Sequence, residues 1–249
     1  MSILAAPFSG FDPNSGVTPV PSSLSALPQT PGIVFPIIDK VWGPGEVVYA
    51  RANGSIRTYG LCVLTPVWDA TNLTYTYNAT EVPNTANLGR TLAVNQVGAL
   101  TAGQYGWFML SGITPINGTA SVAADTTFGI TAAGQVGANS AGKQVLNSRV
   151  VTAATQTVAK TGYGASGDTK LYVPNLDGWF IGGYLSGTGV GASTIVTAMS
   201  PNGPNGAEVT VSVANSAAVA GTITLTYNNA TIFYNVAHMN RPFAQGAIT

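Results

Sequence analysis

Residues 97–151 read VGALTAGQYGWFMLSGITPINGTASVAADTTFGITAAGQVGANSAGKQVLNSRVV, and this stretch decides the fold of the chain. Runs of β-branched and aromatic residues alternate in it with glycine-rich turns, which is typical of strands and not of helices. The pattern predicts four strands, over Tyr105–Leu110, Gly118–Val122, Thr126–Thr131 and Gln144–Val151. We therefore expect the centre of the chain to be β structure.

The first of these strands carries a candidate core motif, Tyr105-Gly106-Trp107. Gly103 and Gly106 flank the tyrosine where a hairpin needs positive φ or a close backbone approach, which glycine provides without steric cost. Successive side chains of a strand point to opposite faces, so the apolar pair Trp107 and Phe108 falls on different faces. A strand that is apolar on both faces is usually covered on both, by its own core and by another layer or subunit.

The composition indicates an all-β protein with long loops. Only 7% of the 249 residues are charged, whereas the surfaces of helices are normally covered by Lys, Glu and Arg. The formal net charge is zero, so a monomer would have little protection against association, and we expect the chain to work within an assembly. The sequence has no basic run, so neither DNA nor RNA is an expected partner.

Changes of composition along the chain predict its organisation in five segments. They are an extended Pro-rich N-terminal arm (1–32), a small β-barrel or sandwich core domain (33–156), a linker (157–168), a second small β-sandwich (169–228), and a C-terminal strand and tail that return to the core (229–249). The linker is expected because small and polar residues fill it. No stretch has the length of a membrane span, and the start of the chain lacks the basic residues of a secretory signal.

The arm combines six prolines with large apolar side chains. Proline at this density favours extended backbone, and the arm cannot form a sheet or helix alone. One interpretation is a flexible terminus. Disordered tails, however, are usually charged and poor in aromatic residues, whereas Asp12 is the only charged residue of the arm. The interpretation we prefer is an arm that lies along a neighbouring subunit. Its expected contact residues are Ile3, Leu4, Phe8, Phe11, Leu24 and Leu27.

A hairpin is expected in the core domain between Glu46–Arg51 and Ile56–Leu64. The connecting Asn53-Gly54 stands between β-prone runs, a combination that favours a type I′ turn.

The second domain is predicted to hold five strands, over 171–173, 179–185, 194–199, 208–214 and 221–227. Its aromatic residues include Trp179 and Tyr184. They either form the core of this domain or present a platform on which a sugar stacks, which would make them an outer binding site.

No motif of the sequence points to catalysis, and we expect no enzyme activity, no cofactor and no metal. A catalytic thiolate at Cys62 would need a His partner, and His238, the only histidine, has no motif around it. Gly137–Gln144 lacks the Ser or Thr of a P-loop, and Gly162–Gly167 fits a dinucleotide fingerprint without a helix after it. The carboxylates Asp125, Asp168 and Asp177 lack the spacing of an acid/base pair or a calcium loop and are expected to be turn residues.

The run Ala102-Gly103-Gln104-Tyr105-Gly106-Trp107, followed by Ser111-Gly112, resembles a run found in the capsid decoration (cement) proteins of tailed bacteriophages. The resemblance covers about residues 97–151 and brings no catalytic residues with it. Residues 169–227 are similar to small β-modules of phage tail and virion surface proteins.

This resemblance implies a structural virion protein, made in the host cytoplasm and bound to the outer capsid surface. Its partner would be the major capsid protein, and homotrimers at local threefold positions are implied by the family alone. The core domain would bind the shell and stabilise contacts between capsomers, while the second domain projects outward. The alternative is a tail-fibre or spike-associated protein that binds a host-surface glycan through Trp179 and Tyr184.

Overall fold

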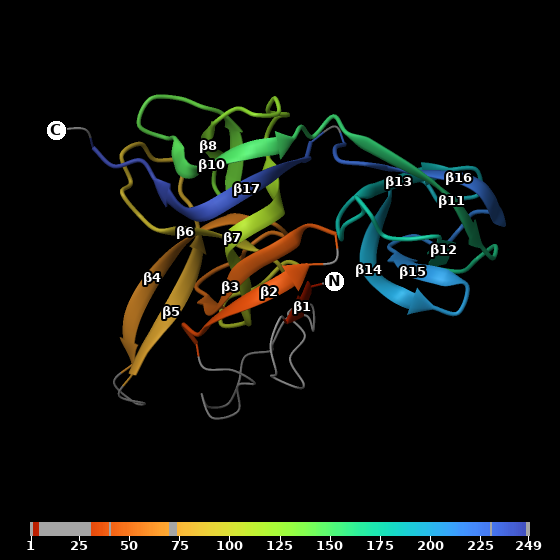
Figure 1. Ribbon diagram of the computed structural model, residues 1–249, viewed down its shortest axis with the longest axis horizontal. Coiled ribbons are helices and arrows are strands. Elements are labelled where there is room, and N and C mark those ends of the chain that lie inside the picture. Colours follow the sequence, from red (N-terminus) through yellow and green to blue (C-terminus); the bar gives the residue numbers. More distant parts are fainter. Residues whose placement is uncertain (1, 5–30, 40, 70–73, 230, 248–249) are drawn as a thin grey trace. The chain divides into compact units, whose positions relative to one another are not determined.

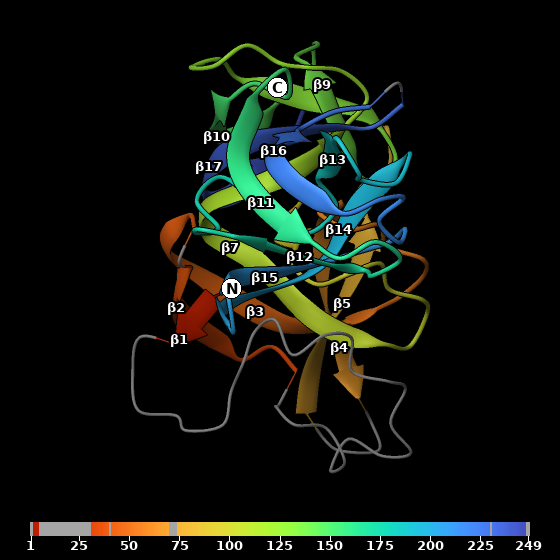
Figure 2. The ribbon, with the colours of Figure 1, turned by 90° about the vertical axis from the view of Figure 1, so that its right-hand side faces the viewer.

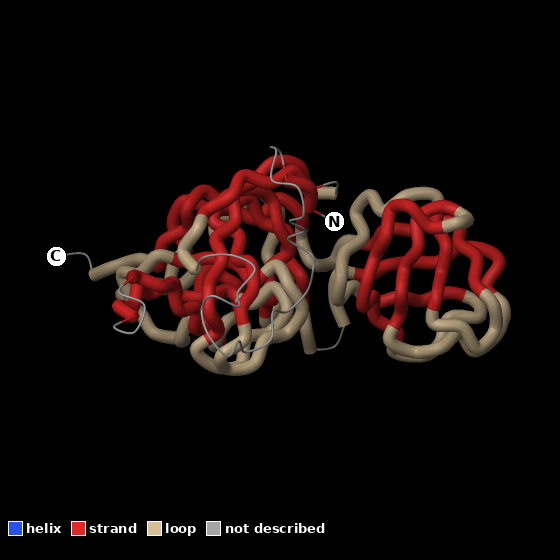
Figure 3. The backbone as a smooth tube through the Cα atoms, turned by 90° about the horizontal axis from the view of Figure 1, so that it is seen from below, coloured by secondary structure: helices blue, strands red, loops and turns tan. Residues whose placement is uncertain are grey.

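The computed structural model describes residues 2–4, 31–39, 41–69, 74–229 and 231–247, and the side chains of 2–4, 69 and 74 are not among the described groups. Every regular element in this part of the chain is a strand, so the all-β prediction is confirmed (Figure 3). The chain divides into two compact units, and we describe each by itself. The first unit is Ser2–Ala153 with Asn235–Thr249, and the second unit is Ala154–Tyr234.

The first unit is built around one large sheet (Figure 1). Its path runs β1-β2-β3-β5-β4-β6-β7-β17-β10, and β8 and β9 join it through β7. The strands are β1 (Ser2–Leu4), β2 (Val34–Asp39), β3 (Gly43–Ala52), β4 (Leu61–Asp69), β5 (Thr74–Glu81), β6 (Leu92–Asn95), β7 (Tyr105–Gly118), β8 (Phe128–Ala132), β9 (Gln135–Ala138), β10 (Val145–Thr152) and β17 (Phe233–Ala244).

Pairing of β3 with β7 closes part of this sheet into a ring of strands, β3-β5-β4-β6-β7. β3 pairs with β7 along most of its length, and Tyr49 lies opposite Trp107. Their ring centroids are 4.8 Å apart, and Phe35 of β2 meets the same indole edge-on at 5.6 Å. These buried aromatic side chains hold β2 and β3 against β7.

Two glycines allow β3 and β7 to cross with their backbones in contact. A Cβ on Gly45 would lie 2.5 Å from the carbonyl oxygen of Ser111, and one on Gly112 would lie 3.0 Å from Cα of Gly45. Gly112 also has a φ of +121°, a conformation that side chains rarely adopt. The register shifts here, next to Glu46, as in a β-bulge.

The expected hairpin between residues 46–51 and 56–64 is wrong. β3 pairs with β2, β5 and β7, whereas β4 pairs with β5 and β6. Neither Asn53 nor Gly54 has positive φ, which a type I′ turn requires at both positions. The connection instead crosses to another part of the sheet, where Ile56 forms a bridge with Leu100.

The expected strand over 118–122 is also wrong, because β7 runs on to Gly118 and residues 119–127 form a loop. Asn235 fixes this segment from the far end of the sequence. Its side-chain oxygen accepts a hydrogen bond from the N–H of Val122 at 2.8 Å, and its amide donates to the carbonyl of Ala120 at 3.0 Å. β17 then pairs with β10 from Val236 onward, so the C-terminal strand belongs to the first unit.

The second unit is a closed antiparallel barrel rather than an open sandwich (Figure 2). Its order is β11-β12-β15-β14-β13-β16, and β16 returns to β11. The strands are β11 (Thr157–Gly164), β12 (Lys170–Val173), β13 (Tyr184–Gly187), β14 (Thr194–Gly203), β15 (Gly206–Val211) and β16 (Val219–Thr226). Alternate side chains of these strands fill the barrel, including Leu171, Val173, Val209, Ile223 and Leu225, all of which are buried.

The expected linker over 157–168 is wrong, because its residues 157–164 form β11, and all eight pair with β16. The small residues of this segment serve the barrel interior. Gly162 lies directly against the side chain of Ile223, where any larger residue would collide. Small and polar composition therefore marks a tightly packed barrel strand here and not a flexible connection.

The expected strand over 179–185 is a loop up to Gly183, and only β13 is strand. Gly178 and Gly182 have φ of +73° and +92°, which interrupts an extended chain. The loop places Trp179 and Phe180 in the barrel core, where both are buried. Phe180 meets the rings of Tyr227 and Tyr234 edge-on at 4.9 and 5.3 Å.

Candidate functional site: exposed surfaces of the two units

The core motif has a packing role. Tyr105 and Trp107 are buried, and Gly106 gives room to its neighbours, since a Cβ there would lie 2.8 Å from a methyl group of Val97. Both faces of β7 are covered within the first unit, because Trp107, Phe108 and Met109 are all almost fully buried. The motif therefore presents no surface for a ligand.

The arm is described only at its start and its end. β1 pairs with β2 of the same chain, with Ile3 opposite Ile38 and Leu4 opposite Ile37. The other expected arm contacts, Phe8, Phe11, Leu24 and Leu27, lie outside the described residues. The single chain thus places residues 2–4 on its own sheet, and contact of the arm with a neighbouring subunit remains a prediction.

β2 presents an apolar outer face next to this edge. Phe35 and Ile37 point into the core, whereas Val34, Pro36 and Ile38 point outward. Ile38 is 48% exposed and Val34 is 43% exposed. β1 forms the end of the sheet path, and no strand pairs with its outer edge in the described part of the chain. An unpaired strand edge beside exposed apolar side chains is a surface for another strand.

A second exposed surface is the aromatic ribbon, by which we mean residues 65–69 of β4 with 74–77 of β5. β6 pairs only with residues 61–63 of β4, and β3 only with 78–79 of β5, so the two strands project beyond the sheet (Figure 1). Trp68 and Tyr75 lie opposite each other with their rings 5.1 Å apart, and they are 50% and 63% exposed.

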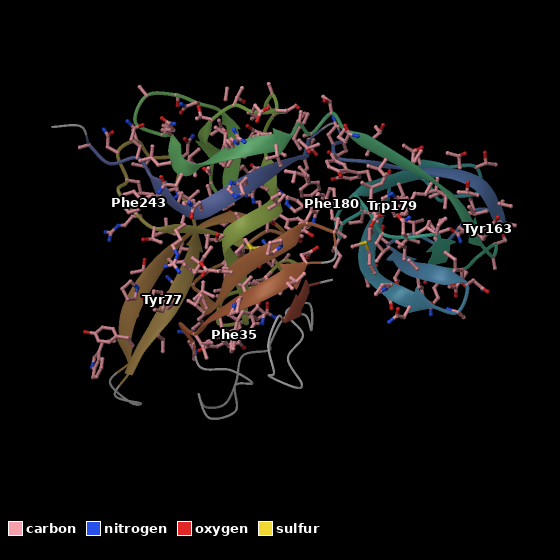
Figure 4. The ribbon with its side chains drawn as sticks, in the orientation of Figure 1. Phe35, Tyr77, Tyr163, Trp179, Phe180 and Phe243 are labelled. Atoms are coloured by element: carbon pink, nitrogen blue, oxygen red, sulfur yellow. The ribbon has the colours of Figure 1, made fainter. Side chains whose placement is uncertain are left out.

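Register places the aromatic side chains of the ribbon on one face. Pro66 is opposite Tyr77 and Trp68 is opposite Tyr75, while Val67 and Thr76 belong to the other face. Figure 4 labels Tyr77 at the root of the ribbon. We call Pro66, Trp68, Tyr75 and Tyr77 the aromatic face.

The structure does not bring Trp179 to the surface of the barrel (Figure 4). Its side chain is fully buried, and its Nε1–H donates to the carbonyl of Val158 at 3.3 Å. Trp179 therefore cannot stack on a sugar, and the core alternative holds for it. Tyr184 is half-buried beside Tyr234, and burial raises its pKa while a hydrogen bond with Asn229 opposes the rise.

The outer face of the barrel carries two other tyrosines. Tyr163 of β11 is 58% exposed and lies opposite Tyr172 of β12. Tyr172 in turn lies opposite Glu208, which forms an ion pair with Lys170 at 2.9 Å. This hydrogen bond from the ammonium to the carboxylate raises the pKa of Lys170.

Cys62 and His238 are the two side chains that were considered as a nucleophile and its partner. Cys62 is fully buried with its Sγ 3.5 Å from the carbonyl oxygen of Gly60, and burial raises the pKa of its thiol well above the ordinary value. His238 is exposed on β17 opposite Arg149. A buried thiol with a raised pKa is a poor nucleophile.

The glycine-rich segments are turns and strands. Lys143, which would hold phosphate in a P-loop, donates instead to Asn84 at 2.8 Å. Asp125 forms an exposed ion pair with Arg149 at 3.5 Å, and Asp168 accepts from the backbone N–H of Lys170. Among the residues with described side chains, no group of three His, Cys, Asp or Glu could hold a metal ion. No helix long and apolar enough for a membrane span occurs where the chain is described.

Sequence reasoning missed the aromatic face and Tyr163. The alternation Leu73-Thr-Tyr75-Thr-Tyr77 places both tyrosines on one face of a strand, and Trp68 precedes it by a few residues. What the sequence does not reveal is that the two strands extend beyond the pairing of β3 and β6 and so leave this face uncovered.

Comparison with known proteins adds no assignment: no family model, no curated protein and no solved structure matches the chain.

Proposed function

We propose that this chain is a structural virion protein that binds the outer surface of a phage head and stabilises the contacts between capsomers. One observation carries the proposal: the open edge of β1, next to the apolar face of β2, is joined to a Pro-rich arm. The sequence resemblance of residues 97–151 to decoration proteins supports the same class.

The open edge can bind by strand addition. The outer backbone groups of β1 offer hydrogen bonds to a strand of the major capsid protein or of a neighbouring copy. Val34, Pro36 and Ile38 provide apolar surface beside that strand, and the 26 residues between Leu4 and Pro31 are long enough to reach a neighbour. At about 25 cal/mol per Å² of apolar surface, a few hundred Å² per copy contributes several kcal/mol.

Symmetry multiplies this contribution. Each copy on a head repeats the same contact, and binding to the assembled shell alone shifts the equilibrium toward the shell. We propose a homotrimer, the state that the resemblance implies, in which three copies share one position on the shell. No catalytic step belongs to this function.

The test measures occupancy of the heads of the encoding phage, prepared without this protein. A chain that lacks residues 1–30 keeps Pro31 and Gly32, which pack within the first unit, and is expected to lose most of its binding. Unchanged occupancy would remove the arm from the mechanism.

A matched pair of point variants separates the β2 face from general surface effects. Ile38→Ser removes an exposed apolar side chain next to β1 and is expected to weaken binding about tenfold, which corresponds to about 1.4 kcal/mol. Val213→Ser makes the equivalent change on the second unit, where Val213 is also exposed, and should leave occupancy unchanged. Equal losses in both variants would contradict the role of the β2 face.

A second candidate function is recognition of a host glycan, and the observation that favours it is the exposed Tyr163 beside Tyr172. Tyrosine rings stack on the apolar face of a sugar, and the neighbouring Lys170–Glu208 pair could hydrogen-bond its hydroxyls. Binding on a glycan array that disappears with Tyr163→Ala, but persists with Val213→Ala, would favour this function over the first.

A further inference from the structure

Asn53 and Gly54 form a bend between two anchored points of the first unit instead of the turn that their sequence favours. On one side, the N–H of Asn53 donates to the carbonyl of Ala79 at 2.9 Å. On the other side, the N–H of Ile56 donates to the carbonyl of Leu100, also at 2.9 Å. The residues between these anchors belong to no strand.

The side chain of Asn53 and the backbone nitrogen of Gly54 are both unrestrained by neighbours. Asn53 is exposed, and its side chain makes no hydrogen bond with the described part of the chain. The N–H of Gly54 likewise donates to no acceptor among the described residues. A Cβ added to Gly54 would meet no atom within 4 Å, so the peptide between the two residues has room to rotate.

An asparagine in this situation can react with the backbone that follows it, which is one reason why asparagine is a thermolabile residue. The nitrogen of Gly54 gives its proton to a base of the solvent and attacks Cγ of Asn53. The N–Cγ bond forms, the Cγ–Nδ2 bond breaks, and the amide leaves as ammonia. Water then opens the cyclic imide at either carbonyl and gives aspartate or isoaspartate. Glycine favours the attack because it has no Cβ to hinder the nitrogen.

We propose that Asn53 is the site at which this chain deamidates, and that the fold protects its other Asn-Gly pairs. The sequence contains three further pairs of this kind: Asn117-Gly118, Asn202-Gly203 and Asn205-Gly206. Sequence alone does not rank the four, whereas their surroundings in the structure do.

The pair Asn117-Gly118 is held on all sides at the end of β7. Both residues are buried, and Asn117 is only 3% exposed. Its Nδ2 donates to the carbonyl of Thr58 at 3.4 Å, and its Oδ1 accepts from Nε2 of Gln135 at 2.8 Å. Cγ of this asparagine cannot turn toward the next nitrogen unless these hydrogen bonds break.

The two pairs of the second unit lie where β14 turns into β15. Asn202 and Asn205 are exposed, but Gly203 and Gly206 are opposite each other in the ladder of the two strands. A Cβ on Gly203 would lie 2.7 Å from the carbonyl oxygen of Gly206, and one on Gly206 would lie 2.7 Å from that of Val173. The backbone here has close neighbours, and rotation of either peptide would disrupt the end of the hairpin.

Deamidation at Asn53 would change both charge and backbone. The formal net charge of the chain is zero, so each converted copy gains one negative charge. Isoaspartate also adds a carbon atom to the main chain between the anchors at Ala79 and Leu100. Copies of this protein therefore become acidic with age at one defined position. The inference concerns the free chain and does not depend on the proposed function.

Peptide mapping of the full chain, incubated at pH 8 and 37 °C, tests the proposal. Trypsin cleaves after Arg51 and Arg57, so Asn53 lies in a short peptide apart from the other pairs. Mass spectrometry detects the replacement of the amide by a hydroxyl group. Conversion at Asn53 is expected to be roughly tenfold or more faster than at Asn117, Asn202 or Asn205, because those segments must open before they react.

Two controls separate the effect of the fold from that of the motif. In denaturant, all four pairs should convert at similar rates, since glycine follows each asparagine. In the folded chain, Gly54→Ala should slow conversion at Asn53 several-fold, because the new methyl group hinders the nitrogen. Gly98→Ala adds a methyl group in equally open surroundings and should leave the rate unchanged.

Two results would overturn the proposal. One is an Asn53 that stays an amide in the folded chain while it converts in denaturant. The other is conversion at Asn117, Asn202 or Asn205 that is as fast as at Asn53 in the folded chain. Both readouts are obtained without heads, so neither depends on whether the chain binds a capsid.

Discussion

In the first unit, glycines and buried aromatic side chains are the residues that determine the packing. Tyr105 and Trp107 could be predicted as core, because a glycine-flanked aromatic strand is a local signal that needs no knowledge of the rest of the fold. For Trp179 the sequence left two alternatives, core residue and sugar platform, because its burial depends on a loop that folds into the barrel. Replacing a glycine that lies against the backbone of another strand tests this packing most directly.

Gly112→Ala is expected to lower the free energy of unfolding by about 2 kcal/mol. The new methyl group would meet the carbonyl oxygen of Pro44 at 2.9 Å, and the φ of +121° strains any side chain. Chemical denaturation measures the change. Gly98→Ala is the control, because no atom lies within 4 Å of its Cβ and its φ is not positive, so its effect should stay within about 0.5 kcal/mol. Equal effects of the two changes would refute the close crossing of β3 and β7.

Two buried tyrosines make the second unit sensitive to high pH. Burial raises the pKa of Tyr227 and of Tyr234 to about 12, against about 10 in an unfolded chain. Below pH 10 both states keep these protons and the two groups cause no pH dependence. Between about pH 10 and 12 the unfolded state binds fewer protons than the folded state, so the free energy of unfolding falls as the pH rises.

Thermal unfolding across pH 9 to 12 checks this dependence, and absorbance at 295 nm follows tyrosine ionisation. Tyr227→Phe removes one buried hydroxyl, which donates to the carbonyl of Gly178 at 2.7 Å, and should make the decline shallower. Ionisation of all ten tyrosines by about pH 10 in the folded chain would contradict the prediction.

At the scale of elements, strand existence was more predictable than strand pairing. The strand at 219–226 is visible in the sequence as the alternation Thr222-Ile-Thr-Leu-Thr226, because a period-2 pattern is local. The partners of β3 and β4 are not, because the Asn53-Gly54 signal favours a hairpin while tertiary pairing with β7 and β6 overrides it. β11 was missed for a similar reason: its small side chains look like a linker until β16 is placed beside it.

Gly54→Ala tests the pairing of these elements. In a type I′ turn this glycine would need positive φ, and alanine would cost about 1 kcal/mol. Gly54 here has no positive φ and no atom within 4 Å of an added Cβ, so the variant should be neutral or slightly more stable.

Gly43→Ala is the matched control for Gly54→Ala in the same denaturation experiment. Gly43 has equally open surroundings but a φ of +85°, and its replacement should therefore destabilise the chain. If Gly54→Ala lowers the stability as much as Gly43→Ala does, the result would support the predicted hairpin and contradict the pairing described here.

At the scale of the whole molecule, the chain combines few charges with several uncharged exposed surfaces. Only 7% of its residues are charged, and the β2 face and the aromatic face are apolar. Low charge and an apolar arm could be read from the sequence, whereas the surfaces depend on which strands end a sheet. We propose that the open edge of β1 and the β2 face bind other proteins of a particle.

A cryo-EM map of heads assembled with this protein tests that proposal most directly. The predicted result is density for both β units on the outer surface of the head, with the β1–β2 edge against the shell or a neighbouring copy. Heads that carry no such density, while the protein is found only at the tail or free in solution, would contradict the account.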